Sequence, residues 1–227
     1  MRIFAISDLH LSFSSDKPMD VFGTAWENHT QRLADNWQTT VGEQDLVLMP
    51  GDISWAMQLR NAAEDLDFLG KLNGKKLIIR GNHDYWWNSL TQVRAFLPSS
   101  VFALQNDAFE TQRYSIGGTR LWSLEDAKTE SGRHIYNREI ERLKLSLGRM
   151  ESCKEKIVMT HYPPFDEARQ QTAATDILEE NTVRTVVYGH LHGKAHCGAF
   201  NGEKNGIRYQ LVSADYLRFC PIQIGEE

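Results

Sequence analysis

The sequence lacks any long apolar run. No segment approaches the roughly 20 apolar residues that a membrane-spanning helix requires. A signal peptide is also missing, because the apolar start Met1–Ile6 meets Ser7 and Asp8 too soon to supply its apolar region. We therefore expect neither a membrane span nor export, and no lipidation signal changes that expectation.

The sequence also has few cysteines and no excess of positively charged residues. Cys153, Cys197 and Cys220 are far apart and form no Cys-x-x-Cys pair, so neither a disulfide framework nor a thiolate metal site is indicated. A reducing, cytoplasmic location fits this pattern. Lys and Arg number 25 against 30 Asp and Glu, a formal net charge of -5. We expect no broad surface for nucleic acid or anionic lipid, although a small local positive site is allowed.

The composition is that of an ordinary globular protein. Hydrophobic residues make up 41% of the chain and charged residues 24%. The length of 227 residues suits one domain, 1–227, because no repeat or linker divides it. Short apolar runs predict buried strands at 3–6, 46–49, 75–80, 157–160 and 185–188. Apolar stripes predict helices at about 24–40, 58–72, 89–97 and 137–151.

Residues 101–124 predict an antiparallel part of the fold, with strands at 101–104, 108–116 and 119–124. Closing strands are expected at 207–212 and 221–224. Gly117-Gly118 would form a hairpin turn. Residues 125–133 predict a charged, mobile loop, where Arg133 and His134 could reach a substrate or simply be solvated. Trp26 and Trp37 lie on a helical stripe and predict core packing, whereas His29 lies off that stripe and predicts a surface position.

Polar side chains of metal-ligand type follow each of the five buried strands. They are Asp8 with His10, Asp52, Asn82 with His83, His161, and His190 with His192. Each fragment alone is also explained by a polar turn, a helix cap or a surface loop. Because the C-terminal ends of strands in α/β sheets share one edge, the repetition predicts convergence on one metal centre. Oxygen and imidazole ligands without thiolate suit manganese, iron or zinc better than calcium.

The ordered motifs resemble those of the calcineurin-like metallophosphoesterase family. They are Asp-x-His, Gly-Asp, Gly-Asn-His-Asp, a lone strand-end His and Gly-His-x-His, spanning residues 8 to 192. The resemblance implies an α/β four-layer sandwich, with two mixed β-sheets packed face to face and flanked by α-helices. It also implies a phosphoester hydrolase with two divalent metal ions, for which we expect Mn²⁺, with Fe or Zn²⁺ as alternatives.

The resemblance also assigns roles by position in the motifs. One ion would be held by Asp8, His10, Asp52 and His192, and the second by Asp52, Asn82, His161 and His190. A hydroxide bridging the two ions would attack phosphorus in line with the leaving group. His83 would give a proton to the leaving oxygen, and Asp84 would orient His83 and keep it protonated near neutral pH.

The sequence departs from one branch of the family. After Gly51-Asp52, the protein serine/threonine phosphatases continue with aspartate, arginine and glycine, whereas this chain has Ile53-Ser54-Trp55-Ala56. A small phosphomonoester or phosphodiester is therefore the expected substrate. The aromatic residues beside the motifs could stack on an aromatic leaving group or pack over the core. They are Trp55, Tyr85, Trp86 and Trp87.

Two other functions compete with the hydrolase. A noncatalytic scaffold of the same fold would bind partner proteins, but such a protein would be expected to lose ligands that this chain retains. A nuclease would keep the chemistry but would need a basic groove, which the acidic balance disfavours.

Overall fold

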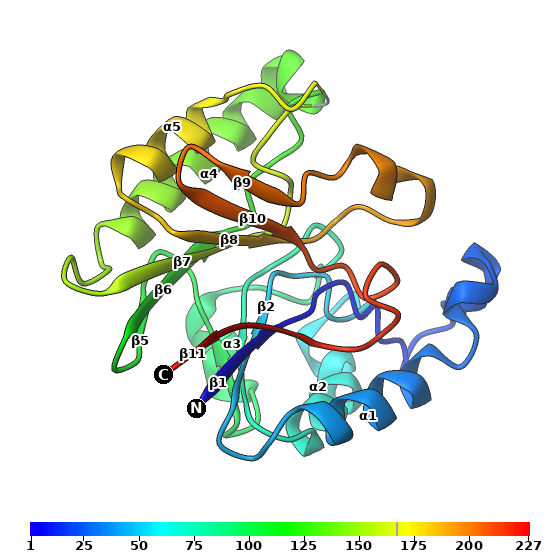
Figure 1. Ribbon diagram of the computed structural model, residues 1–227. Helices are drawn as coiled ribbons and strands as arrows, with labels where there is room; N and C mark the ends of the chain where they lie inside the picture. Colours follow the sequence, from blue (N-terminus) through cyan, green and yellow to red (C-terminus); the bar gives the residue numbers. More distant parts are fainter. Residues whose placement is uncertain (167) are drawn as a thin grey trace.

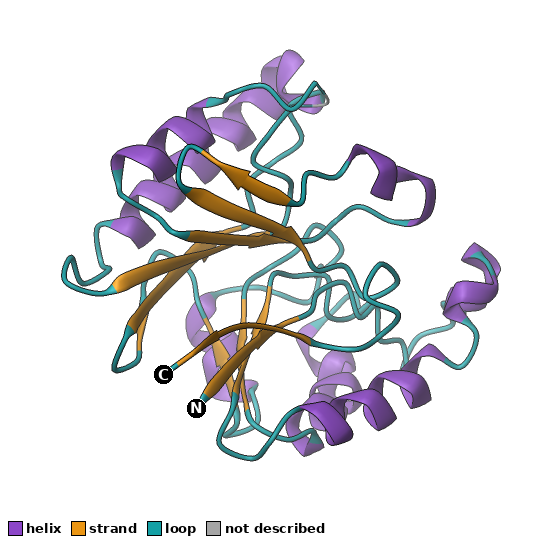
Figure 2. Ribbon diagram, viewed as in Figure 1, coloured by secondary structure: helices purple, strands orange, loops and turns teal. Residues whose placement is uncertain are grey.

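A computed structural model describes residues 1–166 and 168–227. The protein folds into four layers, in which two β-sheets pack against each other and helices cover both outer faces (Figures 1 and 2). This architecture confirms the predicted sandwich of two mixed sheets flanked by helices. None of the described helices has the length and apolar character needed to cross a membrane.

The first sheet has the strand order β11-β1-β2-β3-β4. Its strands are β1 (Arg2–Ala5), β2 (Leu46–Met49), β3 (Lys75–Ile78), β4 (Val101–Ala103) and β11 (Ile222–Glu226). Strands β1 to β4 run parallel to one another, and β11 runs antiparallel to β1. The C-terminal ends of β1, β2 and β3 therefore meet at one edge.

The second sheet has the strand order β5-β6-β7-β8-β10-β9. Its strands are β5 (Phe109–Glu110), β6 (Tyr114–Thr119), β7 (Glu155–Thr160), β8 (Thr185–Tyr188), β9 (Gly202–Lys204) and β10 (Ile207–Leu211). The four central strands are parallel, and the short edge strands β5 and β9 are antiparallel to their neighbours.

Helices cover the outer face of each sheet (Figure 1). The first sheet carries α1 (His29–Thr40), α2 (Ala63–Lys71) and α3 (Leu90–Phe96), and the second carries α4 (Glu130–Leu147) and α5 (Ala173–Glu180). Short 3-10 helices are η1 (Met19–Phe22), η2 (Thr24–Trp26), η3 (Leu59–Ala62), η4 (Asp126–Lys128) and η5 (Gly193–Gly198).

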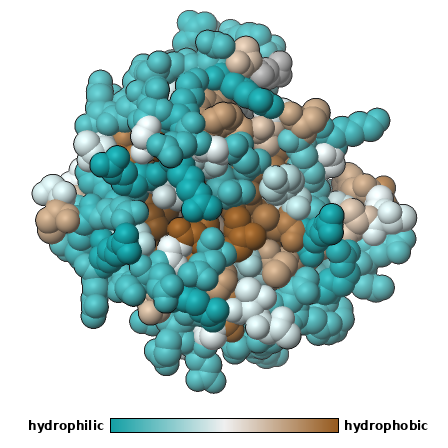
Figure 3. Space-filling model, viewed as in Figure 1, coloured by the Kyte–Doolittle hydropathy of each residue, from teal (hydrophilic) through white to brown (hydrophobic). Residues whose placement is uncertain are grey.

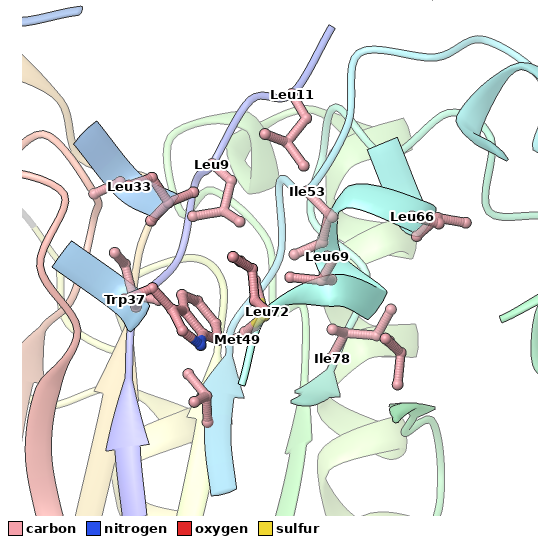
Figure 4. Packing of buried hydrophobic residues seen from close by; sticks show 14 of the residues in the cluster. Leu9, Leu11, Leu33, Trp37, Met49, Ile53, Leu66, Leu69, Leu72 and Ile78 are labelled. Atoms are coloured by element: carbon pink, nitrogen blue, oxygen red, sulfur yellow. The ribbon is translucent and has the colours of Figure 1, made fainter. Parts of the chain in front are cut away.

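Alternate residues of each central strand enter different layers of the core. In β1, Ile3 and Ala5 belong to the cluster between the sheets, whereas Phe4 belongs to the cluster beneath the helices. Figure 4 shows part of this second cluster, where Trp37 of α1 and Leu69 of α2 lie over the strands. Since both faces of the sheet are buried, the strands are continuously apolar and polar groups are left to the strand ends. Figure 3 shows a mainly polar surface, with apolar residues visible in the middle, between the sheets.

Residues 108–124 differ from the prediction. Gly117 and Gly118 form no hairpin turn, because both lie within β6, which pairs in parallel with β7. The strands β5 and β6 are instead joined by residues 111–113, and residues 120–124 form no strand. A Cβ on Gly118 would collide with the backbone of Met159, and one on Gly117 would lie 2.7 Å from the Ser146 hydroxyl of α4. The two glycines permit close packing rather than a turn.

The helix predicted at 24–40 is interrupted. It consists of η2 and α1, which are separated by Asn28 in the left-handed region at φ 51. The prediction that His29 is a surface residue is wrong, because this side chain is 8% exposed and its ring lies 5.5 Å from that of Trp26. The helix predicted at 58–72 likewise consists of η3 followed by α2.

Residues 125–133 are not the predicted loop. They form η4 and the first turn of α4, whose cap Thr129 accepts a hydrogen bond from the backbone N–H of Gly132. Arg133 and His134 are exposed on α4. The sequence pattern did not predict α5 or β9.

Candidate metal centre

The ends of five strands, three from the first sheet and two from the second, bring the candidate ligands together. Backbone hydrogen bonds between the loops fix this meeting point. The N–H of Asp8 donates to Gly51 O at 2.9 Å, and that of His10 donates to Asp52 O at 3.1 Å. In the second sheet, the N–H of Gly189 donates to His161 O at 3.1 Å. The loops thus hold one another at the shared edge.

Asp8, His10 and His192 form the first group of candidate ligands, whose ligand atoms all lie within 4.8 Å of one another. His192 Nε2 lies 3.4 Å from Asp8 Oδ1 and 3.2 Å from His10 Nε2. His10 Nε2 is also 3.8 Å from Asp52 Oδ2. Asp52 therefore borders this group.

The second group surrounds Asn82. Its Oδ1 lies 2.6 Å from His161 Nε2 and 3.0 Å from His190 Nδ1. His161 Nε2 is 3.5 Å from Asp52 Oδ2, and Asp8, Asp52 and His161 also form a compact set of possible ligands. The structure thus brings all seven predicted ligands to one place, with Asp52 between the two groups.

The donor set fits divalent cations. Asp8 and Asp52 are 0% and 1% exposed, and within residues 1–166 and 168–227 their only ion-pair partners are histidines. Burying carboxylates without a cation is costly. Burial and the neighbouring charge of Asp8 raise the pKa of Asp52 well above its usual value. A bound cation would remove this conflict, because it favours both carboxylates in their charged form.

The protonation states of two candidate histidine ligands also suit metal binding. Burial lowers the pKa of His161 to about 3 and that of His190 to about 4, so both rings are neutral, the form that binds metal. His192 differs. Burial would lower its pKa, but hydrogen bonds and charge from Asp215 and Asp8 raise it to about 10. A metal ion at this position would replace the proton that His192 carries.

Several candidate ligands have an unusual backbone conformation. Asp8, His10, Asp52 and His190 have φ values of 58°, 49°, 53° and 71°. Residues other than glycine rarely adopt this left-handed backbone conformation. Where they do, the surrounding structure enforces it, and such residues are found most often at functional sites.

Two glycines leave room for the carboxylates. A Cβ on Gly81 would collide with the side chain and backbone of Asp52. A Cβ on Gly189 would collide with Asp8 and with Ser7, whose hydroxyl donates to Asp8. Both positions therefore require glycine because the chain passes directly over a candidate ligand.

Asp84 does not make the predicted contact with His83. This fully buried carboxylate accepts hydrogen bonds from five N–H groups, and His83 supplies none of them. The donors are the backbone N–H groups of Asp52, Ile53, Ser54 and Gly81 and the indole of Trp86. Asp84 instead fastens the loop after β3 to the loop after β2, which carries Asp52.

His83 lies at the rim of the centre. Its backbone N–H donates to Asp52 Oδ1 at 2.8 Å, and its ring centroid is 4.3 Å from that of Trp55. Among the residues that the structure describes, none forms a hydrogen bond with its buried Nδ1. Burial lowers the pKa of His83, against the expectation that Asp84 keeps it protonated.

The family model described as calcineurin-like phosphoesterase matches residues 1–194, a stretch that contains all seven candidate ligands. The chain belongs to the calcineurin-like phosphoesterase family. Membership of this family supports a hydrolase. No curated protein sequence matches the chain significantly.

Two solved structures resemble the whole chain. Phosphopantetheinyl hydrolase from Mycobacterium tuberculosis has a TM-score of 0.64 at 13% identity, with 100% of this chain and 96% of that chain covered. A protein of unknown function from Aquifex aeolicus has a TM-score of 0.54 at 15% identity, with 98% and 95% covered. At these identities, the likeness shows a shared fold and no more.

Sequence reasoning missed Asp215, which lies beyond the family match. Its Oδ1 is 2.8 Å from His192 Nδ1, and its Oδ2 accepts from the N–H of Gly193 at 3.0 Å. This contact directs His192 Nε2 toward Asp8. His196 lies on the other side, with Nε2 3.2 Å from Asp215 Oδ2. Asp215 follows β10, so the strand-end pattern that identified the other carboxylates could have found it.

The structure separates the aromatic residues that the sequence grouped together. Trp86 and Trp87 are 0% and 2% exposed and belong to the core beneath the helices. Trp55 lies at the centre, where it stacks on His10 with ring centroids 4.9 Å apart. Trp26, which was predicted as core alone, also reaches the centre, and its ring lies 5.5 Å from that of His192.

Proposed function

We propose that the protein is a dinuclear metal-dependent phosphoester hydrolase that acts on a small phosphomonoester or phosphodiester. The position of Asp52 carries this proposal. Its carboxylate lies between the group of His10 and the group of His161, at 3.8 and 3.5 Å from their Nε2 atoms. A shared carboxylate between two sets of ligands is the arrangement that a pair of metal ions requires.

Each set of ligands would hold one ion. One set is Asp8, His10, Asp52 and His192, and the other is Asp52, Asn82, His161 and His190. When bound, the two ions would supply Lewis-acid activation of water and of the phosphate. Two divalent ions would bring four positive charges, and Asp8 and Asp52 contribute two negative charges. The site would therefore keep a net positive charge that attracts the phosphate anion. The mixed ligands favour Mn²⁺, with Fe or Zn²⁺ as alternatives.

His83 would donate a proton to the leaving oxygen. Its position at the rim, where it lines a cavity beside the centre, supports this role. Proton transfer from a positioned side chain contributes about 10² to 10⁴ in rate. The hydrolase name of the similar Mycobacterium tuberculosis structure supports the reaction class without indicating this protein's substrate. We also propose a cytoplasmic location, because all three cysteines are unpaired.

Two substitutions test the proposal in the metal-loaded protein. Asp52→Asn should lose bound metal in elemental analysis and abolish Mn²⁺-stimulated hydrolysis of an aryl phosphate. His83→Ala should keep its metal and lose about 10² to 10⁴ in kcat. The exposed residues Asp67 and His134 provide matched controls as Asp67→Asn and His134→Ala.

Unchanged turnover in both Asp52→Asn and His83→Ala would refute the hydrolase. Inactivity of the metal-loaded wild-type protein on a broad panel of phosphomonoesters and phosphodiesters would favour the noncatalytic scaffold instead.

A further inference from the structure

A cavity of about 450 Å³ opens beside the metal centre. One side is formed by His10, His83 and His192, which belong to the centre. The adjoining wall is apolar and consists of Met19, Phe22, Trp26 and Trp55. A group attached to a phosphate at the centre would meet this wall.

The apolar wall comes largely from a segment that projects from the body of the protein. Figure 1 shows η1 and η2, in dark blue, standing away from both sheets. The indole N–H of Trp55 donates to Met19 Sδ at 3.1 Å, which ties η1 to the loop after β2. Met19 and Trp26 belong to the core cluster beneath the helices, and Trp55 packs against that cluster, so the wall is the edge of this core where two loops meet at the centre.

Phe22 is the member of the wall that is most open to solvent, at 67% exposed. Val21 beside it and Met57, two residues after Trp55, are 71% and 65% exposed but are not among the residues that line the cavity.

The position of His83 identifies which part of the substrate lies here. A second cavity, of about 440 Å³, borders His190 and includes Glu125 and Asp166, but His83 does not line it. This step rests on the proposed function, in which His83 protonates the leaving oxygen. The leaving group must therefore occupy the first cavity.

We infer that the substrate is a phosphoester whose leaving alcohol is bulky and apolar. A sugar or polyol would place hydroxyl groups against Met19, Phe22 and Trp26 with too few hydrogen-bond partners, whereas an aryl or hydrocarbon group would bury apolar surface. The ammonium of Lys17 lies 4.8 Å from the centroid of the Trp55 ring, so a positively charged alcohol is also disfavoured.

The test compares two aryl phosphates with leaving groups of similar acidity. Metal-loaded wild-type protein should hydrolyse 2-naphthyl phosphate with a kcat/KM about tenfold above that for phenyl phosphate, because the second ring fills the cavity. Among esters of weakly acidic alcohols, a long-chain alkyl phosphate should be hydrolysed faster than glycerol phosphate or glucose phosphate, because its chain buries apolar surface in the cavity.

Phe22→Ser should reduce the ratio of kcat/KM for 2-naphthyl phosphate to kcat/KM for phenyl phosphate toward unity, because part of the apolar wall is removed. Leu145→Ser is the matched control, because Leu145 is 54% exposed on α4 and lies far from the cavity in sequence and fold. Circular dichroism on both variants would verify folding.

Equal rates for the two aryl esters, faster turnover of a sugar phosphate than of the alkyl phosphate, or an unchanged preference in Phe22→Ser would each overturn the inference while leaving the hydrolase intact. Inactivity on every ester would instead refute the hydrolase, and the inference with it.

Discussion

Replacing Asp84 by asparagine distinguishes a structural role for this carboxylate from a role through His83. Oδ2 accepts from the backbone N–H groups of Asp52 and Gly81 at 2.9 and 2.7 Å. Oδ1 accepts from Ile53, Ser54 and the Trp86 indole at 2.9, 3.2 and 2.9 Å. In Asp84→Asn, the new NH₂ group must face one of these two sets of donors, so at least two hydrogen bonds are lost.

The size of the effect follows from these bonds. Hydrogen bonds to a charged group contribute about 1.5–3 kcal/mol each, so losing two costs about 3–6 kcal/mol. Burial raises the pKa of Asp84, whereas these hydrogen bonds lower it. The cost of burying the carboxylate therefore already offsets part of the stability that the hydrogen bonds contribute to the wild-type protein. We therefore expect a loss near the lower end, about 3 kcal/mol of unfolding free energy. Since Asp84 also holds the backbone at Asp52, metal affinity should fall as well.

The assay is urea unfolding of chelator-treated protein, followed by tryptophan fluorescence, together with calorimetric titration of Mn²⁺. His83→Ala is the control, because removing the half-buried ring should leave stability and metal affinity nearly unchanged. The reasoning fails if Asp84→Asn keeps wild-type stability and metal affinity but loses activity. That result would mean that Asp84 acts through His83, as the sequence suggested.

Three further substitutions test other parts of the structure. Asp215→Ala should weaken metal binding by about 10- to 100-fold in calorimetry, because His192 loses the acceptor that orients it; an unchanged affinity would contradict this role. Gly189→Ala should displace Asp8 and lower the metal content found by elemental analysis, whereas Gly198→Ala, where a Cβ meets nothing within 4 Å, should not. Burial lowers the pKa of Lys76 from 10.5 to about 8, so between these pH values the unfolded state binds a proton that the folded state lacks. The stability of the wild-type protein should therefore rise with pH relative to Lys76→Met, by about 3 kcal/mol over this range, and a constant difference in urea unfolding would refute the shift.

Local sequence patterns determined the central strands and the candidate ligands. Short β-branched runs such as Ile157-Val158 are buried on both faces, so they could be recognised without knowing their neighbours. The polar residues after them, such as Asp52 and His161, were expected at strand ends, because a strand that is buried on both faces leaves polar side chains without hydrogen-bond partners. Convergence followed from the parallel order, which places those ends at one edge.

The tertiary structure alone decided which side chains contact one another. Gly117-Gly118 reads as a turn, but packing against Ser146 and Met159 places it within β6. Asp84 stands next to His83 in the sequence, yet its donors come mainly from the loop after β2, about 30 residues earlier.

Contacts between distant segments also explain which residues sequence reasoning placed wrongly or missed. Asp215 approaches His192 only because β10 pairs with β8, and Trp26 reaches the centre only because η2 folds back over His192. Periodicity and turn chemistry describe how each segment folds. The partners of a polar or aromatic side chain depend on which distant loops meet, and packing of the whole chain determines that.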